Sequence, residues 1–406
     1  MTQAIGVEPE CPFTPAALKK VVYAGVQSSS FVQGVKDLAA LAELSVSRER
    51  VQRWTKRVGH ERHTAMEAQA AAYQTLALPE QRHSPTGQVP QVACVQMDGG
   101  RIQVRERDNA SPPGQTKGHW RETLVGCLLS MSSEEHEVDP CPTIPQTFVD
   151  PQRMADLSRE IKGFCGEAAE EDSGPEEAVD VHSKPPPVLV RSVVATREGV
   201  EIFGPRLIAA AYARGFNAAP RKAFVADGSA TNWGVWRKHF SHYTPILDFT
   251  HAICYVYAAA MAGRTVAGGW LDYSRWAQWL WTGHTQALIA ALETRSQELG
   301  PLEEEDSETC PRRVVAEALR YVENQRSRMK YAEYRRQGLP ITSSHIESTI
   351  KQVNRRVKGT EKFWDQGAEP LLQLVADHLS ETPDLPRFWK QRPSRLPATR
   401  CYQTAA

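Results

Sequence analysis

The sequence lacks the cysteine spacing typical of zinc-binding proteins and of disulfide-stabilised secreted proteins. Eight cysteines are scattered over 406 residues, and no two of them form a C-x-x-C pair. Structural zinc sites and disulfide frameworks both need closely and regularly spaced cysteines. The sequence therefore argues against a zinc finger and against a secreted disulfide scaffold, and we interpret the cysteines as ordinary thiols.

The sequence also lacks any apolar run long enough to cross a bilayer, and it has no charged-then-apolar signal segment at its N-terminus. Hydrophobic residues make up 41% of the chain, which is enough to build a large core, and the length favours two or three structural units. We therefore expect a soluble, cytoplasmic protein with no membrane partner.

The formal net charge is zero because two oppositely charged segments cancel. Residues 134–180 contain 14 acidic and three basic side chains, whereas residues 312–362 contain 13 basic and five acidic ones. The basic segment permits a nucleic-acid partner, but the total charge does not require one.

The N-terminal region, residues 15–64, has the apolar pattern of helices. Residues 37–44 carry apolar side chains at helical spacing, and after a short turn residues 48–58 form a second predicted helix, capped by Ser47. A further Ala- and Gln-rich helix is expected at residues 64–78. The first two helices have the outline of a helix-turn-helix.

In this interpretation Val46, Val51 and Trp54 seat the second helix on the first, and its basic side chains stay exposed. Four arginines are then placed to contact DNA phosphates or base edges: Arg48, Arg50, Arg53 and Arg57. Any pair of helices with a basic, solvated face has a similar pattern, so a purely structural role is an open alternative.

The middle of the chain has the two-residue period of β-strands, followed by a long helical region. Strands are expected at residues 91–97, 101–107, 122–131, 188–196, 222–226 and 244–249. Residues 132–187 have the composition of an inserted connection, with one helix near residues 154–164. Helices are expected at residues 205–214, 251–334 and 340–378, and the tail from residue 383 is expected to be irregular. This order predicts an α/β fold with a mixed sheet.

Three acidic residues stand at the ends of these predicted elements. Asp98 and Asp227 each follow a short apolar run, and Glu347 opens a basic helix. Carboxylates from distant parts of a chain are the ligands that hold a pair of Mg²⁺ ions about 4 Å apart for phosphodiester chemistry. Each acid also has a structural interpretation: a hairpin turn at Asp98, an Asp-Gly turn at Asp227, and a capping box between Ser344 and Glu347.

Several motifs in this order resemble bacterial insertion-sequence transposases of the Kra group, which are related to Lre-type and Mutator-like transposases. The motifs are DGGRIQVR from Asp98, WRE from Trp120, ADG ending at Gly228 with Trp233 close behind, ILDFTH ending at His251, SHIES from Ser344, and RRVKGT from Arg355. The resemblance extends over about residues 31–379.

The resemblance implies a DDE transposase with a ribonuclease H-like fold. It implies that Asp98, Asp227 and Glu347 bind two Mg²⁺ ions, for which Mn²⁺ can substitute, and that Asp248 and His251 form a supporting D-x-x-H pair. The implied regions are 1–88 (helix-turn-helix), 89–250 (first part of the core, with the acidic insertion 132–187), 251–338 (all-helical insertion), 339–382 (C-terminal core helix) and 383–406 (tail). The implied partners are double-stranded DNA, at the transposon ends and the target, and further copies of the chain. The implied location is the nucleoid of a bacterial cytoplasm.

Around Glu347, basic side chains recur at helical spacing and are placed to contact phosphates flanking the scissile bond: Lys351, Arg355, Arg356 and Lys358. A solvated basic face is the alternative. The aromatic series Trp270, Tyr273, Trp276, Trp279 and Trp281 is interpreted as core, with base stacking as the alternative.

Three other functions are compatible with the same residues. A non-catalytic descendant would bind DNA without cutting it, and a structure-specific nuclease of the same fold would cut branched DNA without transposon ends. A glycosidase would use two of the acids as an acid/base pair and would be insensitive to chelation.

Overall fold

A computed structural model describes residues 11–104, 119–163, 185–358, 362, 364 and 367–395. The predicted strand end at residues 105–107, residues 164–184 of the acidic insertion and the residues Gly359 and Thr360 of the last motif lie outside the described residues. Within the described parts, no helix is long and apolar enough to span a membrane.

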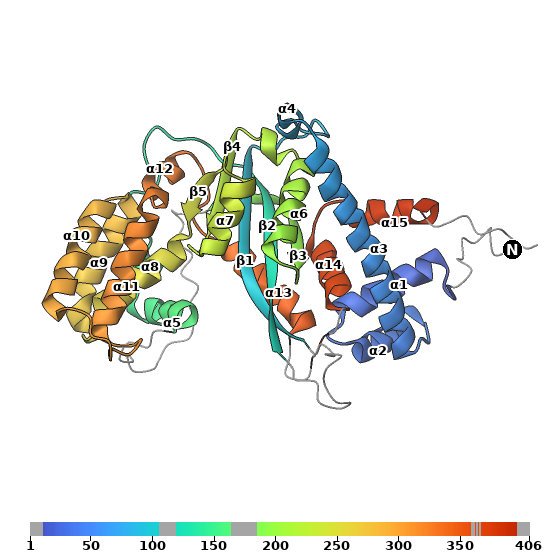
Figure 1. Cartoon of the computed structure of the whole chain (residues 1–406), viewed down its shortest axis with the longest axis horizontal. Helices are drawn as coiled ribbons and strands as arrows, with labels where there is room; N and C mark the ends of the chain where they lie inside the picture. Colours follow the sequence, from blue (N-terminus) through green and yellow to red (C-terminus); the bar gives the residue numbers. More distant parts are fainter. Residues whose placement is uncertain are drawn as a thin grey trace, which may run out of the picture.

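The centre of the molecule is a mixed five-stranded sheet, so the predicted α/β class is confirmed (Figure 1). The strands are β1 (Val92–Val104), β2 (His119–Met131), β3 (Val188–Thr196), β4 (Arg221–Ala226) and β5 (Thr244–Leu247). Their order is β3-β2-β1-β4-β5. The strands β1, β2 and β3 pair antiparallel, whereas β4 is parallel to both β1 and β5.

Strand β1 runs without a break through Asp98, Gly99 and Gly100, so the predicted hairpin turn at these residues is wrong. These residues pair with Val125, Leu124 and Thr123 of β2. The close approach explains one glycine, because a Cβ on Gly100 would lie 2.8 Å from the Thr123 hydroxyl. Asp98 therefore lies inside a strand, rather than at a strand tip as predicted.

Helices cover both faces of the sheet. Cys127 of β2 contacts Thr349 of α13 (Ser344–Val357), with 3.1 Å between Sγ and Oγ1. A Cβ added to the adjacent Gly126 would instead meet Leu207 of α6 (Val200–Ala213). Because neighbouring strand residues point to opposite faces, α13 and α6 cover opposite sides of the sheet. The remaining helices next to the sheet are α7 (Ala230–His239) and α14 (Ala368–Leu379).

The N-terminal helices are α1 (Pro15–Gln27), α2 (Phe31–Ala42) and α3 (Arg48–Thr75). Ser47 caps α3 as predicted, since its hydroxyl accepts a hydrogen bond from the Arg50 N–H at 3.4 Å, and Val46, Val51 and Trp54 are buried. However, α3 is one helix rather than the two predicted at 48–58 and 64–78. No proline interrupts residues 48–75, so the helix continues.

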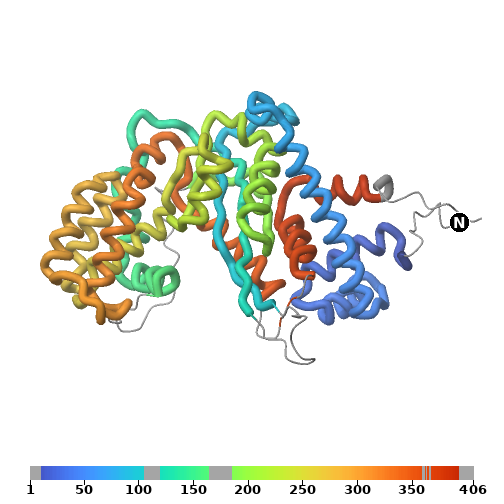
Figure 2. Tube along the Cα trace, in the orientation of Figure 1, coloured from blue at the N-terminus to red at the C-terminus, as the bar shows by residue number. Residues whose placement is uncertain are grey.

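The N-terminal helices are packed into the body of the protein. One hydrophobic cluster combines residues of α1 to α3 with the end of β1 (Ile102 and Val104), the end of α13 (Val357) and α14 (Leu372). A buried ion pair adds to this contact: Arg62 of α3 binds Asp377 of α14, with Nε to Oδ2 at 2.8 Å. Figure 2 shows α3 lying along α14.

The region after β5 is helical, as predicted, and forms a lobe at one end of the molecule (Figure 1). Its helices are α8 (Phe249–Met261), α9 (Val266–Thr282), α10 (Thr285–Leu299), α11 (Pro311–Gln325) and α12 (Tyr331–Arg336). Helix α5 (Pro151–Lys162) packs against α8. Tyr273, Trp276 and Trp281 are buried, which confirms the interpretation of the aromatic series as core for these three residues.

The tail beyond residue 383 was predicted to be irregular, which is wrong for residues Asp384–Arg395, because they form α15; residues 396–406 lie outside the described residues. Phe388 of this helix is buried in the N-terminal cluster, which gives the segment an apolar contact to fold against. The short elements are α4 (Leu78–Gln81), η1 (Gln146–Phe148), η2 (Phe216–Ala218) and η3 (Arg326–Arg328).

Candidate functional site

Asp98 and Asp227 come together where β4 ends. In the parallel pairing of β1 with β4, Gln96 lies opposite Val225, and two residues further along each chain are Asp98 and Asp227. Both acids line one polar pocket of about 440 Å³. Asp227 follows its strand as predicted, so the sequence located this meeting point correctly even though β1 continues beyond it.

Asp227 is held in place by its own turn and by α7. Its Oδ1 accepts hydrogen bonds from the Ser229 N–H at 2.9 Å and from the Asn232 side chain at 2.8 Å. Gly228 has a φ of 98°, a left-handed conformation that glycine adopts without strain. One carboxylate oxygen is therefore fixed by the protein, which leaves the other for the pocket.

The helical lobe also forms hydrogen bonds with the turn at Asp227 and Gly228. The Tyr321 hydroxyl of α11 donates a hydrogen bond to the Asp227 carbonyl at 2.7 Å, and the Gln325 amide donates one to the Gly228 carbonyl at 3.2 Å. The lobe thus supports the turn that carries the second aspartate, in addition to α7.

Glu347 lies in the first turn of α13, but the capping box expected between Ser344 and Glu347 is absent from this described turn, because the helix begins at Ser344 and its N-cap is Ser343. The Ser343 carbonyl accepts from the Ile346 N–H at 3.0 Å, and distant side chains supply further acceptors. The Ser343 N–H donates to Asp248 Oδ1 at 2.8 Å, and the Ile346 N–H donates to Gln96 Oε1 at 3.1 Å.

The predicted supporting pair, Asp248 and His251, lies against Glu347. Asp248 is fully buried and is the N-cap of α8, and its Oδ2 accepts from the His251 N–H at 3.0 Å and lies 2.6 Å from His251 Nδ1. Donor atoms of Asp248, His251 and Glu347 all lie within 4.8 Å of one another. The D-x-x-H pair therefore acts both as a helix cap and as a neighbour of the predicted metal ligand.

The crowding of carboxylates changes their protonation. Burial, together with the charge of Asp227, raises the pKa of Asp98 to about 6. Burial and the charge of Asp248 also raise the pKa of Glu347. Burial lowers the pKa of His251, but the hydrogen bond that its ring N–H donates to Asp248 and the charges of Asp248, Asp227 and Glu347 outweigh it and raise the value to about 9. The protonated imidazole is therefore the local counter-charge of the acids.

These residues fit a pair of divalent cations. Burial and like-charge repulsion oppose ionisation of Asp98 and Glu347, and a cation among the carboxylates would relieve that repulsion. Donor atoms of Asp98, Asp227 and Glu347 do not form a single group within 4.8 Å in the described part of the chain. A two-metal site does not require this, because its outer ligands bind different ions about 4 Å apart.

A second acidic cluster does not fit a metal. His63, Glu198 and Glu369 also have donor atoms within 4.8 Å of one another. The buried guanidinium of Arg206 already lies among them, at 2.8 Å from Glu198 and 2.9 Å from Glu369. This internal cation makes the cluster an ion-pair network that joins α3, α6 and α14.

The predicted phosphate contacts on α13 differ in their surroundings. Lys358 and Asn354 line the acidic pocket, on the same helical face as Glu347. Lys351 is exposed and forms an ion pair with Glu160 at 2.8 Å, and Arg355 is exposed. Arg356 is buried and donates to the Gly25 carbonyl at 2.8 and 3.1 Å, so its guanidinium is directed into the fold rather than onto the surface where the predicted DNA contact would need it.

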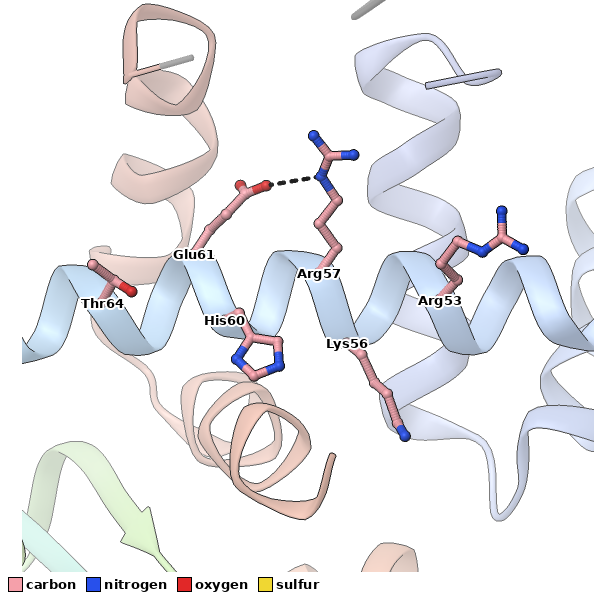
Figure 3. Close-up of a pocket in the computed structure, with 6 residues that line it drawn as sticks. All are labelled: Arg53, Lys56, Arg57, His60, Glu61 and Thr64. Atoms are coloured by element: carbon pink, nitrogen blue, oxygen red, sulfur yellow. Dashed lines mark ion pairs between the residues drawn. The ribbon is translucent and has the colours of Figure 1, made fainter. Parts of the chain in front are cut away.

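The predicted basic face of α3 is exposed at Arg48, Arg50 and Arg53. Arg57 is more constrained, because it lies 4.9 Å from the Trp54 ring and pairs with Glu61 at 3.8 Å. Figure 3 shows Arg53 and Arg57 projecting from one side of α3, while Lys56 and His60 project from the other.

Three residues that support the site were not predicted from the sequence: Gln96, Asn232 and Tyr321. Asn232 follows Asp227 by five residues, so an amide in the helix after a strand-end acid was a detectable local signal. Gln96 and Tyr321 act on segments far away in the sequence, and their roles depend on the tertiary fold.

Comparison with known proteins adds no relative, since no protein-family model matches the chain and no curated protein matches it significantly. The functional conclusion therefore depends on the residues and geometry described above.

Proposed function

We propose that this chain is a metal-dependent DNA transposase of the ribonuclease H-like class, similar to the Kra group of insertion-sequence transposases. The observation that carries the proposal is the shared pocket of Asp98 and Asp227, closed on one side by the face of α13 that bears Glu347. The charges of Glu347 and Asp98 act on one another, so the three acids belong to one electrostatic unit.

The topology supports the same class. Three antiparallel strands followed by two parallel ones, in the order β3-β2-β1-β4-β5, agree with a ribonuclease H-like core. The helical lobe lies between the second aspartate and the glutamate in the chain, where the resemblance places an insertion.

In this proposal Asp98, Asp227 and Glu347 would hold two Mg²⁺ ions, with Mn²⁺ as a substitute. Bound ions of this kind activate the attacking water or 3′-hydroxyl and stabilise the leaving oxygen. Asn232 fixes the orientation of Asp227, and Lys358 and Asn354 would bind the phosphates beside the scissile bond. The basic face of α3 would bind the terminal inverted repeats. Two or more copies would act together, because the two ends of the element must be cut together. The reaction would take place in the cytoplasm, at the nucleoid.

The test is cleavage and joining of a duplex that carries the inverted repeats flanking the gene. The purified protein should nick the repeat ends in Mg²⁺ or Mn²⁺ and should lose this activity in EDTA. We expect Asp98→Asn, Asp227→Asn and Glu347→Gln each to lower the cleavage rate at least about 1,000-fold, as expected when a ligand of a catalytic metal is removed. Repeat binding should be retained by all three variants.

A matched control is Asp156→Asn, which removes an exposed acid of α5 outside the pocket and should cut at the wild-type rate. Wild-type cutting by any of the three site variants would remove that residue from the site. Repeat binding without cutting would indicate a non-catalytic descendant, and cutting of branched DNA without repeats would indicate a structure-specific nuclease.

A further inference from the structure

Gln96 connects strand β1, which carries Asp98, to helix α13, which carries Glu347. It is fully buried on β1, two residues before Asp98, so both side chains leave the same face of the sheet. Its Nε2 donates to the Thr342 carbonyl at 3.0 Å, and its Oε1 accepts from the Ile346 N–H at 3.1 Å. Ile346 immediately precedes Glu347.

The bond from the Ile346 N–H to Gln96 takes the place of a local side-chain cap, in addition to the bond of the same N–H to the Ser343 carbonyl at 3.0 Å. The first N–H groups of a helix have no partner within the helix, and a Ser or Thr side chain at the N-cap normally accepts from one of them. In the described residues around the start of α13, the Ser343 side chain does not accept such a bond. The position of the first turn of α13, which carries Glu347, therefore depends on Gln96, a side chain of the strand that also carries Asp98.

We propose that Gln96 is a positioning residue that sets the placement of Glu347 relative to Asp98 and thereby the affinity of the site for divalent cations. This inference rests on the proposed metal site and adds to it a residue that contacts neither cation nor DNA. Groups that orient metal ligands typically change metal affinity or activity about 10- to 100-fold when they are removed.

The packing of α13 makes the inference testable without loss of the helix. Further along α13, Thr349 contacts Cys127, and Val353 and Val357 belong to the N-terminal hydrophobic cluster. Gln96→Met keeps the length and the apolar volume of the side chain but removes both hydrogen bonds. The variant should therefore keep α13 on the sheet while loosening its first turn.

The matched control is Asn217→Leu. Asn217 is also a buried, hydrogen-bonded amide, since it donates to the Gln81 carbonyl at 2.9 Å and to the Tyr73 hydroxyl at 3.4 Å and accepts from the Tyr243 hydroxyl at 3.0 Å. It lies in η2, outside α13, and does not line the acidic pocket. A general loss of stability would affect both variants, whereas a change in the metal site should affect only Gln96→Met.

The experiment measures Tb³⁺ luminescence and its displacement by Mg²⁺, on the full chain without DNA. We expect Gln96→Met to weaken Tb³⁺ and Mg²⁺ binding about 10- to 100-fold and Asn217→Leu to bind like the wild type. In the cleavage assay, Gln96→Met should need more Mg²⁺ for half-maximal rate, with an unchanged KM for DNA, and excess Mg²⁺ should restore its rate. If Gln96→Met does not fold, Gln96→Asn, whose amide is one methylene too short, should shift binding in the same direction.

Equal Tb³⁺ and Mg²⁺ affinities in Gln96→Met and the wild type would overturn this inference and leave the proposed function intact. Equal weakening in Asn217→Leu would also overturn it, because the effect would then be general. A wild-type protein that binds neither Tb³⁺ nor Mg²⁺ would instead overturn the proposed metal-dependent function, and the positioning role with it.

Discussion

At the scale of single residues, the acidic pocket gathers more negative charge than the positive charge of the surrounding side chains balances. Asp98 lies beside Asp227, and Glu347 lies beside Asp248, while the protonated His251 is the nearby cation. Like charges that are gathered in a partly buried place weaken the folded state unless a ligand joins them. We therefore expect the pocket to lower the free energy of unfolding of the metal-free protein, and bound divalent cations to restore it.

The pH dependence of stability in the metal-free protein tests this. The pKa of Asp98 is raised to about 6 in the folded protein, from 3.8. The folded state then takes up its proton first, so this group should increase the free energy of unfolding as the pH falls from about 7 to about 4. At pH 8 in EDTA, Asp98→Asn should be more stable than the wild type by about 2 kcal/mol.

Urea unfolding at several pH values measures the difference between the two proteins. The gap should close as the pH approaches 4, and added Mg²⁺ should stabilise the wild type more than the variant. A variant that is less stable than the wild type at pH 8 in EDTA would contradict the expectation.

At the scale of elements, the start of α13 shows where sequence reasoning ends. The pattern Ser344-x-x-Glu347 is a sound local signal for a capping box, yet the helix starts one residue earlier than that pattern needs, with Ser343 rather than Ser344 as its N-cap. The side chains that accept from its first turn are those of Asp248 and Gln96, which are 95 and 250 residues away in the chain from the N–H groups they bind. No local pattern contains that information.

The course of β1 was ambiguous for a similar reason. Asp98-Gly99-Gly100 fits a tight turn and also fits a strand that needs small residues beside a close neighbour. The long pairing with β2 decides between them, and β2 is not adjacent in the sequence to this segment. By contrast, the end of β4 before Asp227 and the helices after β5 follow from local periodicity, and the structure agrees with both predictions.

The contact between α3 and α14 gives a prediction at this scale. Arg62 and Asp377 form a buried pair with two hydrogen bonds, at 2.8 and 3.1 Å. Arg62→Met leaves a buried carboxylate unpaired and should lower the free energy of unfolding by about 3–5 kcal/mol. Adding Asp377→Leu should recover most of this loss, because an apolar pair does not leave a charge unpaired.

Chemical denaturation of the wild type, the two single variants and the double variant measures the coupling. The exposed pair Lys238–Glu201, at 2.5 Å, supplies the control, and Lys238→Met should leave the unfolding midpoint nearly unchanged. If Arg62→Met unfolds at the wild-type midpoint, then α3 is not joined to α14 in the way described.

At the scale of the whole molecule, the predicted N-terminal region is packed as a structural part of the body that contains the sheet. Residues 1–88 were expected to form a separate DNA-binding region, but α1 to α3 share a hydrophobic cluster with β1, α13 and α14. Helical periodicity identified this region as helical, but it carries no information about the surfaces against which its helices pack. The exposed arginines of α3 are therefore fixed relative to the acidic pocket, rather than carried on a flexible module.

DNA affinity as a function of salt tests whether this fixed basic face contacts the phosphate backbone. Each phosphate neutralised by a cationic side chain adds about 0.9 to the slope of log affinity against log salt for double-stranded DNA. Arg50 and Arg53 lie on one exposed face of α3, so the double change Arg50→Ala/Arg53→Ala should lower this slope by up to about 2. Binding in EDTA keeps cleavage out of the measurement.

The control for this prediction is Arg275→Ala, which removes an exposed arginine of α9 in the helical lobe. It should keep the wild-type slope if DNA lies along α3 and the acidic pocket. If the double variant loses affinity equally for repeat and unrelated duplexes, α3 binds phosphates; if it loses affinity for the repeat alone, α3 reads bases as a recognition helix would. An unchanged slope and affinity in the double variant would place the DNA elsewhere, because two exposed cations on a rigid surface cannot bind phosphates without contributing to the salt dependence.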